Sequence, residues 1–199
     1  MTRVDTQQVH VGCNGDDTVA EFDRTESGRL KFHQLIKVSK DTDTAQAQPH
    51  AHWMGFDGKS MVTPNSNTSD STLFDFNSYA IIDKQPTGAL PIATGMMPDS
   101  SKSYVSNYLG DTITVMCGPY GSCNPGQIIG EINLLQGYDP VSGSNSAGFV
   151  GLDGNTITKG LLGGFSVQTP VSPDGKFVIQ GNTLSGTITI IDTKTDKLV

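Results

Sequence analysis

The residues best suited to chemistry lie in one short stretch, QPHAHWMGFDGK, which covers residues 48–59. His50, His52 and Met54 alternate along it, so their side chains would share one face of a β-strand. Imidazole and thioether groups both suit copper. These three residues could therefore bind copper, but they form an incomplete site unless missing parts of the protein contribute further ligands, and no cofactor is evident from the sequence. The alternative is an ordinary strand in which a histidine is hydrogen-bonded to backbone or water and Met54 packs in the core.

The three cysteines offer a second kind of chemistry. Cys117 and Cys123 bracket the small loop GPYGS, and in an oxidising compartment we expect a disulfide to close it. The alternative is a pair of free loop thiols. The spacing is neither CxxC nor the CxxCH of an attached haem, and no second cysteine pair supports a zinc site. Cys13 is left over.

Motifs for nucleophilic catalysis and phosphate binding are lacking in the sequence. There is no GxSxG elbow, and the segments GLLGG and GLDG have no Lys-Ser/Thr after them. The loops NGDDT and GLDGNT fit hairpin turns better than a calcium site, because such turns need Asn, Asp and Gly. His10 and His33 lie in other predicted strands and receive no role. We therefore assign no catalytic residue.

Composition limits the classes of protein that are possible. The chain has 199 residues, 35% hydrophobic residues and 23 glycines, which is typical of a β-rich, turn-rich domain. A net charge of −7 without a basic cluster argues against nucleic acid as a partner. No apolar run reaches the length of a transmembrane segment, and the N-terminus lacks the apolar core of a signal peptide. Either the protein is cytoplasmic or its true start is missing.

An internal repeat organises these residues. Asp57, Asp99 and Asp174 each sit in a predicted tight turn, followed by a short strand, a polar loop and a β-branched or aromatic strand. The first two anchors are 42 residues apart, which is the period of a propeller blade. The next gap is 75 residues, so we expect an insertion at about residues 135–164. The unit is four antiparallel strands, and the fold class is an all-β propeller.

Two copies of the unit resemble a known repeat family. SPDGKFVIQGNTLSGTITIIDTKTDKLV and PDSSKSYVSNYLGDTITVM are similar to the YVTN β-propeller repeat, and residues 104–107 (YVSN) match its namesake tetrad most closely. Propellers of this kind include lactonase-like enzymes, the haem-bearing propeller of nitrite reductases, and surface or secreted proteins without known activity. The resemblance implies the fold and leaves the function open.

The repeat predicts one propeller region over residues 1–199. It contains a partial blade at 1–40, a blade at 45–90, a blade with the insertion at 91–165, and a partial blade at 166–199. We expect the chain to enter near the second strand of one blade and to leave after the third strand of another. About four blades make an incomplete ring, so we expect a portion of a longer protein. Missing sequence would then include a signal for export to the periplasm or outside.

The propeller interpretation also places the histidine stretch. The strand before the aspartate turn is the innermost strand of a blade, so His50 and His52 should face the axial channel and Trp53 should point the opposite way. The equivalent positions of the other blades supply no further imidazole: they are Ile92, Thr94 and Met96, and Val167, Thr169 and Val171.

Two functions follow as hypotheses. The first is a non-catalytic, extracytoplasmic propeller module that binds a protein or a small molecule, because the blade pattern is regular and carries no catalytic motif. The alternative is a lactonase-like enzyme or a haem- or copper-binding electron-transfer domain, with its site at the channel end near His50 and His52.

Overall fold

The computed structural model describes residues 1–135, 138–139, 144–145, 164–183 and 185–199. These residues form strands and turns, and none of them is helical. The expected all-β class is therefore confirmed. The expected insertion at residues 135–164 lies almost entirely outside the described residues. Within the described residues, no helix is present that could span a membrane.

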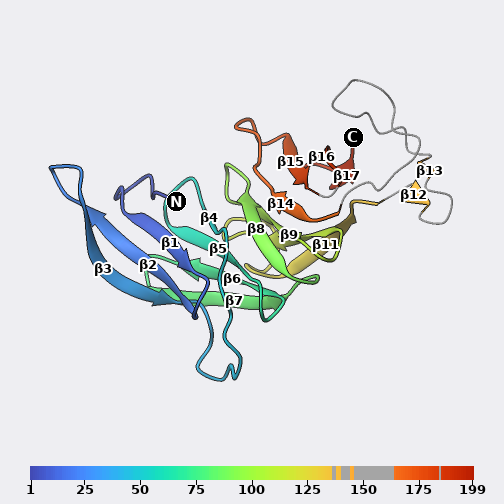
Figure 1. The fold of residues 1–199 in the computed structure, drawn as a ribbon. Coiled ribbons are helices and arrows are strands. Elements are labelled where there is room, and N and C mark those ends of the chain that lie inside the picture. The colour runs from blue at the N-terminus through green and yellow to red at the C-terminus, as the bar shows by residue number, and fades with distance from the viewer. Residues whose placement is uncertain (136–137, 140–143, 146–163, 184) are drawn as a thin grey trace.

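The strands form four antiparallel sheets, and strands that are neighbours in sequence are neighbours in each sheet (Figure 1). The first sheet has three strands and the next three have four each. A separate short hairpin joins β12 (Tyr138–Asp139) to β13 (Ser144–Asn145).

The strands of the first sheet are β1 (Val9–Cys13), β2 (Thr18–Arg24) and β3 (Leu30–Lys37). Those of the second are β4 (Trp53–Met54), β5 (Ser60–Asn65), β6 (Asp70–Asp75) and β7 (Ala80–Pro86). Those of the third are β8 (Pro91–Met96), β9 (Lys102–Asn107), β10 (Thr112–Cys117) and β11 (Ile128–Asn133). Those of the fourth are β14 (Ser166–Gln168), β15 (Phe177–Asn182), β16 (Thr187–Asp192) and β17 (Lys197–Leu198).

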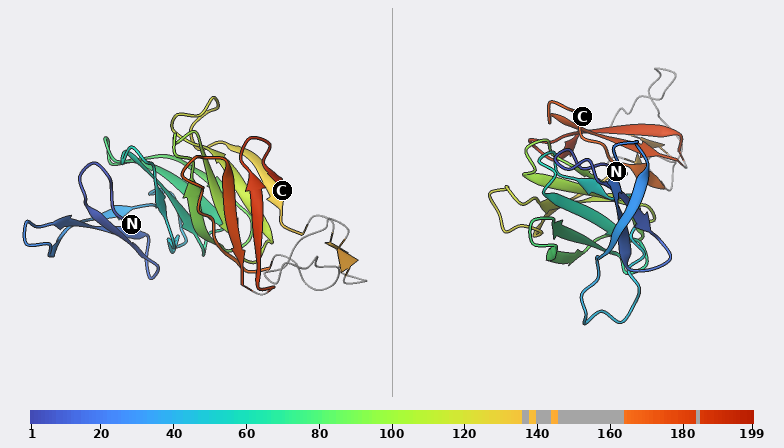
Figure 2. Two further views of the ribbon diagram at one scale, coloured as in Figure 1. Left: turned by 90° about the horizontal axis from the view of Figure 1, so that it is seen from above. Right: turned by 90° about the vertical axis from the view of Figure 1, so that its left-hand side faces the viewer.

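The four sheets stand side by side as an open array, and the core lies between them (Figure 2). Side chains alternate between the two faces of a strand, so an inner sheet can bury both faces. Accordingly, every residue of β5 is buried. Three apolar clusters fill the three gaps. The cluster between the first and second sheets includes Val19, Ile36, Met54, Met61 and Phe74. The cluster between the second and third sheets includes Val62, Leu73, Met96 and Val105. The cluster between the third and fourth sheets includes Tyr104, Ile113, Val115, Val178 and Ile191.

The three predicted aspartate turns are structurally equivalent, which confirms the repeat. Asp57, Asp99 and Asp174 each precede the second strand of a sheet. Each carboxylate accepts a hydrogen bond from the backbone N–H two residues later, at 3.0, 2.9 and 3.1 Å in chain order. The residue after each aspartate has a positive φ, which glycine adopts most easily. These residues are Gly58, Ser100 and Gly175.

A buried asparagine at the end of the second strand forms a further repeated feature, which sequence analysis missed. The Asn107 side-chain amide donates to the hydroxyls of Thr112 and Thr114, both at 2.9 Å. Asn182 makes the same two bonds to its third strand, and Asn65 bonds one hydroxyl and one carboxylate there. The amide thus ties the second strand to the third across the connecting turn.

The prediction that the chain ends after a third strand is wrong. β17 adds a short fourth strand, in which Lys197 and Leu198 pair with the end of β16. The turn can close because Asp196 adopts a positive φ of 52° and its N–H donates to the Asp192 carbonyl at 2.8 Å. The Asp196 carboxylate also accepts the Tyr104 hydroxyl at 2.7 Å, which fixes this turn against the third sheet.

The cysteines of the GPYGS loop lie close together. The structure joins Cys117 and Cys123 by a disulfide, with their Cα atoms 5.9 Å apart, while Cys13 is free and partly exposed. Cys117 is fully buried at the end of β10, so the bridge anchors the loop to the sheet.

Candidate functional site

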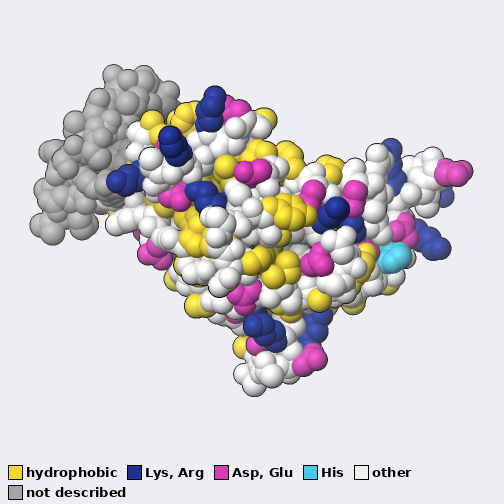
Figure 3. All heavy atoms as spheres, turned by 180° about the vertical axis from the view of Figure 1, so that it is seen from behind, with side chains coloured by type: hydrophobic (Ala, Val, Ile, Leu, Met, Phe, Trp, Pro, Cys, Tyr) yellow, Lys and Arg dark blue, Asp and Glu magenta, His cyan; other side chains and the backbone are white. Residues whose placement is uncertain are grey.

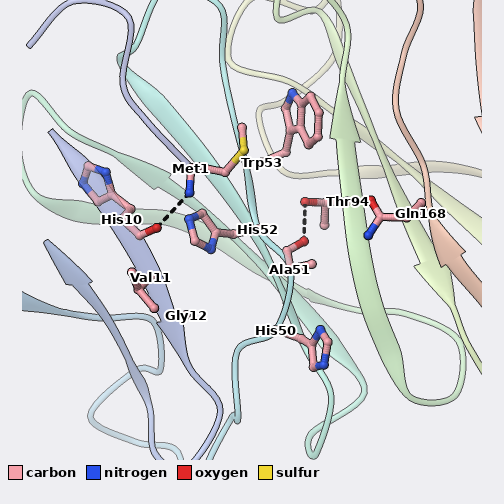
Figure 4. A pocket seen from close by; sticks show the side chains of 10 residues that line it. All are labelled: Met1, His10, Val11, Gly12, His50, Ala51, His52, Trp53, Thr94 and Gln168. Atoms are coloured by element: carbon pink, nitrogen blue, oxygen red, sulfur yellow. Dashed lines mark hydrogen bonds between the residues drawn. The ribbon is translucent and has the colours of Figure 1, made fainter. Parts of the chain in front are cut away.

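The inner strands of the sheets surround a hollow on the propeller axis (Figure 4). It is a cavity of about 370 Å³. The second, third and fourth sheets contribute their inner strands, and the first contributes β1 and the chain start. The lining combines apolar atoms with a few polar side chains. Among the lining residues are Met1, His10, His52, Trp53, Thr94 and Gln168.

Direct contacts between neighbouring inner strands hold this cavity in shape. The backbone N–H of Ala51 donates to the Ile92 carbonyl at 3.0 Å, and the Ala51 carbonyl accepts the Thr94 N–H at 3.1 Å. These bonds pair the second sheet with the third in parallel at the axis. Further along, Gly95 approaches the backbone of Thr169 in the fourth sheet so closely that a Cβ at residue 95 would lie 1.9 Å from the Thr169 oxygen.

His52 is the most unusual side chain of the cavity. It is only 6% exposed, and neither ring nitrogen has a hydrogen-bond partner among the described residues. Burial lowers the pKa of His52 to about 3, and the positive charges of the N-terminal ammonium and His10 act in the same direction. The imidazole is therefore neutral at physiological pH and can offer one donor and one acceptor to a ligand.

His50 and His52 both line the cavity, as the expected channel-facing position requires, but their side chains do not lie together on one face. His50 is exposed, and the two rings lie apart in Figure 4. Alternation fails because residues 49–52 form only isolated bridges and the regular strand begins at Trp53. From His52 onward alternation holds: Met54 faces the first sheet, and Trp53 packs toward the third.

The described residues do not bring His50, His52 and Met54 together as ligands of one copper ion. Met54 lies in the apolar cluster between the first and second sheets. Across the described part of the chain, no three His, Cys, Asp or Glu side chains gather into a group that could hold a metal ion. His52 is the member of the predicted trio that combines burial with unpaired ring nitrogens at the cavity.

A buried network around Glu21 borders the cavity and was missed in the sequence. Its carboxylate is bonded to His10 Nε2 at 2.7 Å, and it accepts the Gln34 amide at 2.9 Å and the Tyr79 hydroxyl at 3.1 Å. His10 and Glu21 are both buried. Desolvation lowers the pKa of His10 despite its carboxylate partner, and burial raises the pKa of Tyr79. One signal in the sequence could have indicated this network. In the strand TVAEFDR, Glu21 lies two residues after Val19, so alternation places its side chain on the same, core-facing side.

The burial of His52 predicts a pH-dependent stability. An unfolded histidine binds a proton below about pH 6.5, whereas folded His52 does so only near pH 3. The unfolded state therefore gains stability relative to the folded state as pH falls through this window. Between about pH 7.5 and about pH 5 we expect the free energy of unfolding to fall by about 2 kcal/mol through this residue alone.

Urea unfolding of the His52→Leu variant at both pH values checks this expectation. The variant should lose the contribution of His52, whereas the buried His10, whose pKa is also lowered, should leave a remaining pH dependence of the same sign. The matched control is His50→Leu, which replaces an exposed histidine two residues away and should retain the contribution of His52. Equal pH dependence in both variants would contradict the assignment.

Comparison with known proteins identifies the fold and no family. No protein-family model and no curated protein matches the sequence. Among solved structures, the chain is similar to hydrazine synthase of Kuenenia stuttgartiensis, with a TM-score of 0.67 and 15% identity over 100% of this chain and 46% of that one. It is similar to virginiamycin B lyase from Staphylococcus aureus, with a TM-score of 0.64 and 13% identity over 100% and 53%.

A third similar structure is the Swd1 β-propeller domain of Myceliophteria thermophila, with a TM-score of 0.64 and 12% identity over 96% of this chain and 55% of that one. Such low identities establish the propeller fold alone. The chain spans about half the length of the structures it matches.

Proposed function

We propose that this chain belongs to a non-catalytic β-propeller module of the YVTN type, which acts outside the cytoplasm and binds a small neutral ligand in its axial cavity. The observation that carries the proposal is the cavity itself, which draws its lining from all four sheets. A concave, mainly apolar site with a few polar groups is the usual form of a small-molecule site.

The chemistry of the lining suggests the ligand class. Trp53 offers an aromatic surface, Gln168 and Thr94 offer polar groups, and His52 is neutral. The lining contains no Lys, Arg, Asp or Glu side chain that could pair with a charged ligand. Moving an ion from water into such a site would cost free energy, whereas a neutral ligand avoids that cost. We therefore expect a neutral, ring-containing molecule with one or two hydrogen-bonding groups.

A fragment screen tests this function. Neutral lactones, monosaccharides and aromatic amides would be screened for binding to the full chain by ligand-observed NMR, with fluorescence of Trp53 as the second readout. Trp53 is the only tryptophan of the chain and lines the cavity, so its signal reports on this site. Filling the cavity with Ala51→Phe should abolish binding, whereas Ala45→Phe, at an exposed loop position, should leave it unchanged.

Two results would overturn the proposal. The first is hydrolysis of a lactone by the wild-type chain that disappears with His52→Ala, which would favour an enzyme. The second is a set of bound fragments whose binding survives Ala51→Phe, which would place the ligand elsewhere.

The unpaired imidazole of His52 favours a second candidate, a metal-binding or catalytic propeller. His52 lines the cavity, and its two buried ring nitrogens have no hydrogen-bond partner among the described residues, so either would be free to bind a metal such as copper if the ring turned toward the cavity. Copper titration of the wild type and His52→Ala tests this candidate. A tenfold loss of affinity, about 1.4 kcal/mol, would support a ligand role. Equal weak binding would exclude it.

The cysteine pair supports the location we propose. A disulfide between Cys117 and Cys123 forms in an oxidising compartment, so a module carrying it would act in the periplasm or outside the cell. Thiol titration of protein exported by a host and purified without reductant should find one reactive group, Cys13. Three reactive thiols in the denatured protein would refute the export proposal.

A further inference from the structure

The turn between β1 and β2 contains the only Asn-Gly pair of the sequence. Asn14 and Gly15 open the segment NGDDT, and both residues are exposed. Gly15 has no positive φ, and a Cβ built on it would meet no heavy atom within 4 Å beyond its chain neighbours. Within the described residues, the Gly15 N–H has no hydrogen-bond partner. The backbone nitrogen of Gly15 is therefore unhindered beside the side chain of Asn14.

An asparagine in this setting can react with its own backbone. The Gly15 nitrogen bonds to Cγ of Asn14, the bond from Cγ to the side-chain nitrogen breaks, and that nitrogen leaves as ammonia with the proton of the Gly15 N–H. Water then opens the cyclic imide and leaves a carboxylate, either as aspartate or as isoaspartate. No atom is oxidised or reduced, and water is the only co-reactant. Glycine favours the first step because it has no Cβ and reaches conformations that other residues avoid.

The Asn14 side chain is held only loosely in the folded chain. Its Nδ2 donates to the Gln48 carbonyl at 3.3 Å and to the Ser66 hydroxyl at 3.4 Å, both beyond the usual range of such bonds. Asn67 gives a contrast within the same molecule. It is also exposed in a turn, but its Nδ2 donates to a backbone carbonyl at 2.7 Å, and the branched Thr68 follows it. The reaction should therefore select Asn14.

We propose that Asn14 is a site of spontaneous deamidation, and that the product loosens the hold of this turn on the segment that leads into the axial cavity. The turn contacts that segment at two consecutive residues. The Asp17 carboxylate accepts the Ala47 N–H, and the Asp16 carbonyl accepts the Gln48 N–H at 3.2 Å. Asn14 completes the contact by donating to the Gln48 carbonyl. Deamidation removes this last donor.

The conformation of Gln48 connects this contact to the cavity. Gln48 adopts a positive φ of 54°, which is unfavourable for a residue with a Cβ and persists only where its surroundings hold it. It lies two residues before His50, which lines the cavity. After deamidation, residue 14 has no side-chain N–H to donate, and its carboxylate would lie against the Gln48 carbonyl oxygen. The Ser66 N–H and hydroxyl still donate to that oxygen, at 3.2 and 2.9 Å, so we expect local loosening rather than unfolding.

The charge that deamidation adds is also unfavourable in this turn. The turn already holds Asp16 and Asp17, and the chain has a net charge of −7. Lys37 pairs with Thr18 at the end of this hairpin, but its ammonium already bonds the Asp41 carboxylate at 2.9 Å. On the face seen in Figure 3, basic side chains are likewise interspersed with acidic ones. A carboxylate at residue 14 would therefore gain little attraction and would repel its neighbours.

Peptide mapping of the full chain by mass spectrometry tests the modification. Folded protein is incubated in neutral buffer, and the peptides that contain Asn14 and Asn67 are followed over time. We expect aspartate and isoaspartate to accumulate at residue 14 while Asn67 stays intact. Gly15→Ala should slow the conversion about tenfold, which corresponds to about 1.4 kcal/mol in the barrier, and its methyl group has room in the fold. An intact Asn14, conversion of Asn67 at the same rate, or conversion of Gly15→Ala at the wild-type rate would overturn the proposal.

Amide hydrogen exchange tests the structural consequence. Asn14→Asp reproduces the aspartate product, and we expect the Ala47 and Gln48 amides to exchange about tenfold faster than in the wild type, because both bond to this turn. Asn124→Asp adds the same charge at an exposed position after Cys123 and should leave both amides unchanged. Circular dichroism shows that each variant is folded. Wild-type exchange in Asn14→Asp, or equal acceleration in Asn124→Asp, would overturn the proposed loosening. Neither experiment uses a ligand, so neither outcome depends on the function proposed above.

Discussion

The Gly95→Ala variant is expected to lose about 3 kcal/mol of folding stability, because its methyl group would enter space already filled by backbone. A Cβ at residue 95 would lie 1.9 Å from the carbonyl oxygen of Thr169. A backbone oxygen cannot rotate away as a flexible side chain can, so the inner strands of the third and fourth sheets would have to separate. Gly95 has no positive φ, so the cost comes from space alone.

Gly130→Ala is the matched control for this prediction. Gly130 also lies in a strand of the third sheet, but its added Cβ would meet only the Val115 side chain at an ordinary 3.9 Å. We expect its stability to stay within about 0.5 kcal/mol of the wild type. Urea unfolding followed by circular dichroism measures both variants. Equal stability of the two would show that the inner strands do not approach each other as the structure has them.

The repeat could be predicted from sequence because its signals are local. Asp57, Asp99 and Asp174 each lie in a turn that depends on the residues beside them, and the strands that follow are β-branched or aromatic. Turn chemistry and strand propensity act within about ten residues, so their spacing alone indicates four-stranded units. The short β17 was missed because its turn, around Asp196, is fixed by contacts with the third sheet.

The candidate site could be predicted only in part, because its geometry depends on contacts between sheets. The sequence pointed to the strand that carries His52 and to its place near the axis. It could not show that His50 would diverge, since the irregular backbone at residues 49–52 follows from pairing with Ile92 and Ala93 of another sheet. The Glu21 network was hidden for the same reason: its partners come from residues 10, 34 and 79.

Asn107→Ala should also be strongly destabilising, by about 3 kcal/mol. The variant loses two hydrogen bonds worth about 1 kcal/mol each and leaves the buried Thr114 hydroxyl without its amide donor. It also leaves a small void in the third sheet, which is covered on both faces. Because this amide links β9 to β10 across a tight turn, unfolding of the variant should begin with the loss of that pairing, visible as faster amide exchange in both strands.

The control for Asn107→Ala is Asn124→Ala. Asn124 is exposed directly after Cys123, and its backbone carbonyl accepts the Gln127 N–H at 3.0 Å, a bond that alanine retains. Its stability should remain within about 0.5 kcal/mol of the wild type. Replacing both hydroxyl partners as well, in Asn107→Ala/Thr112→Val/Thr114→Val, should recover part of the loss, because the variant then buries no unpaired hydroxyl at this turn. A triple variant that is about 2 kcal/mol less stable than Asn107→Ala would contradict this account. It would mean that the two hydroxyls make other hydrogen bonds, which do not depend on the Asn107 amide.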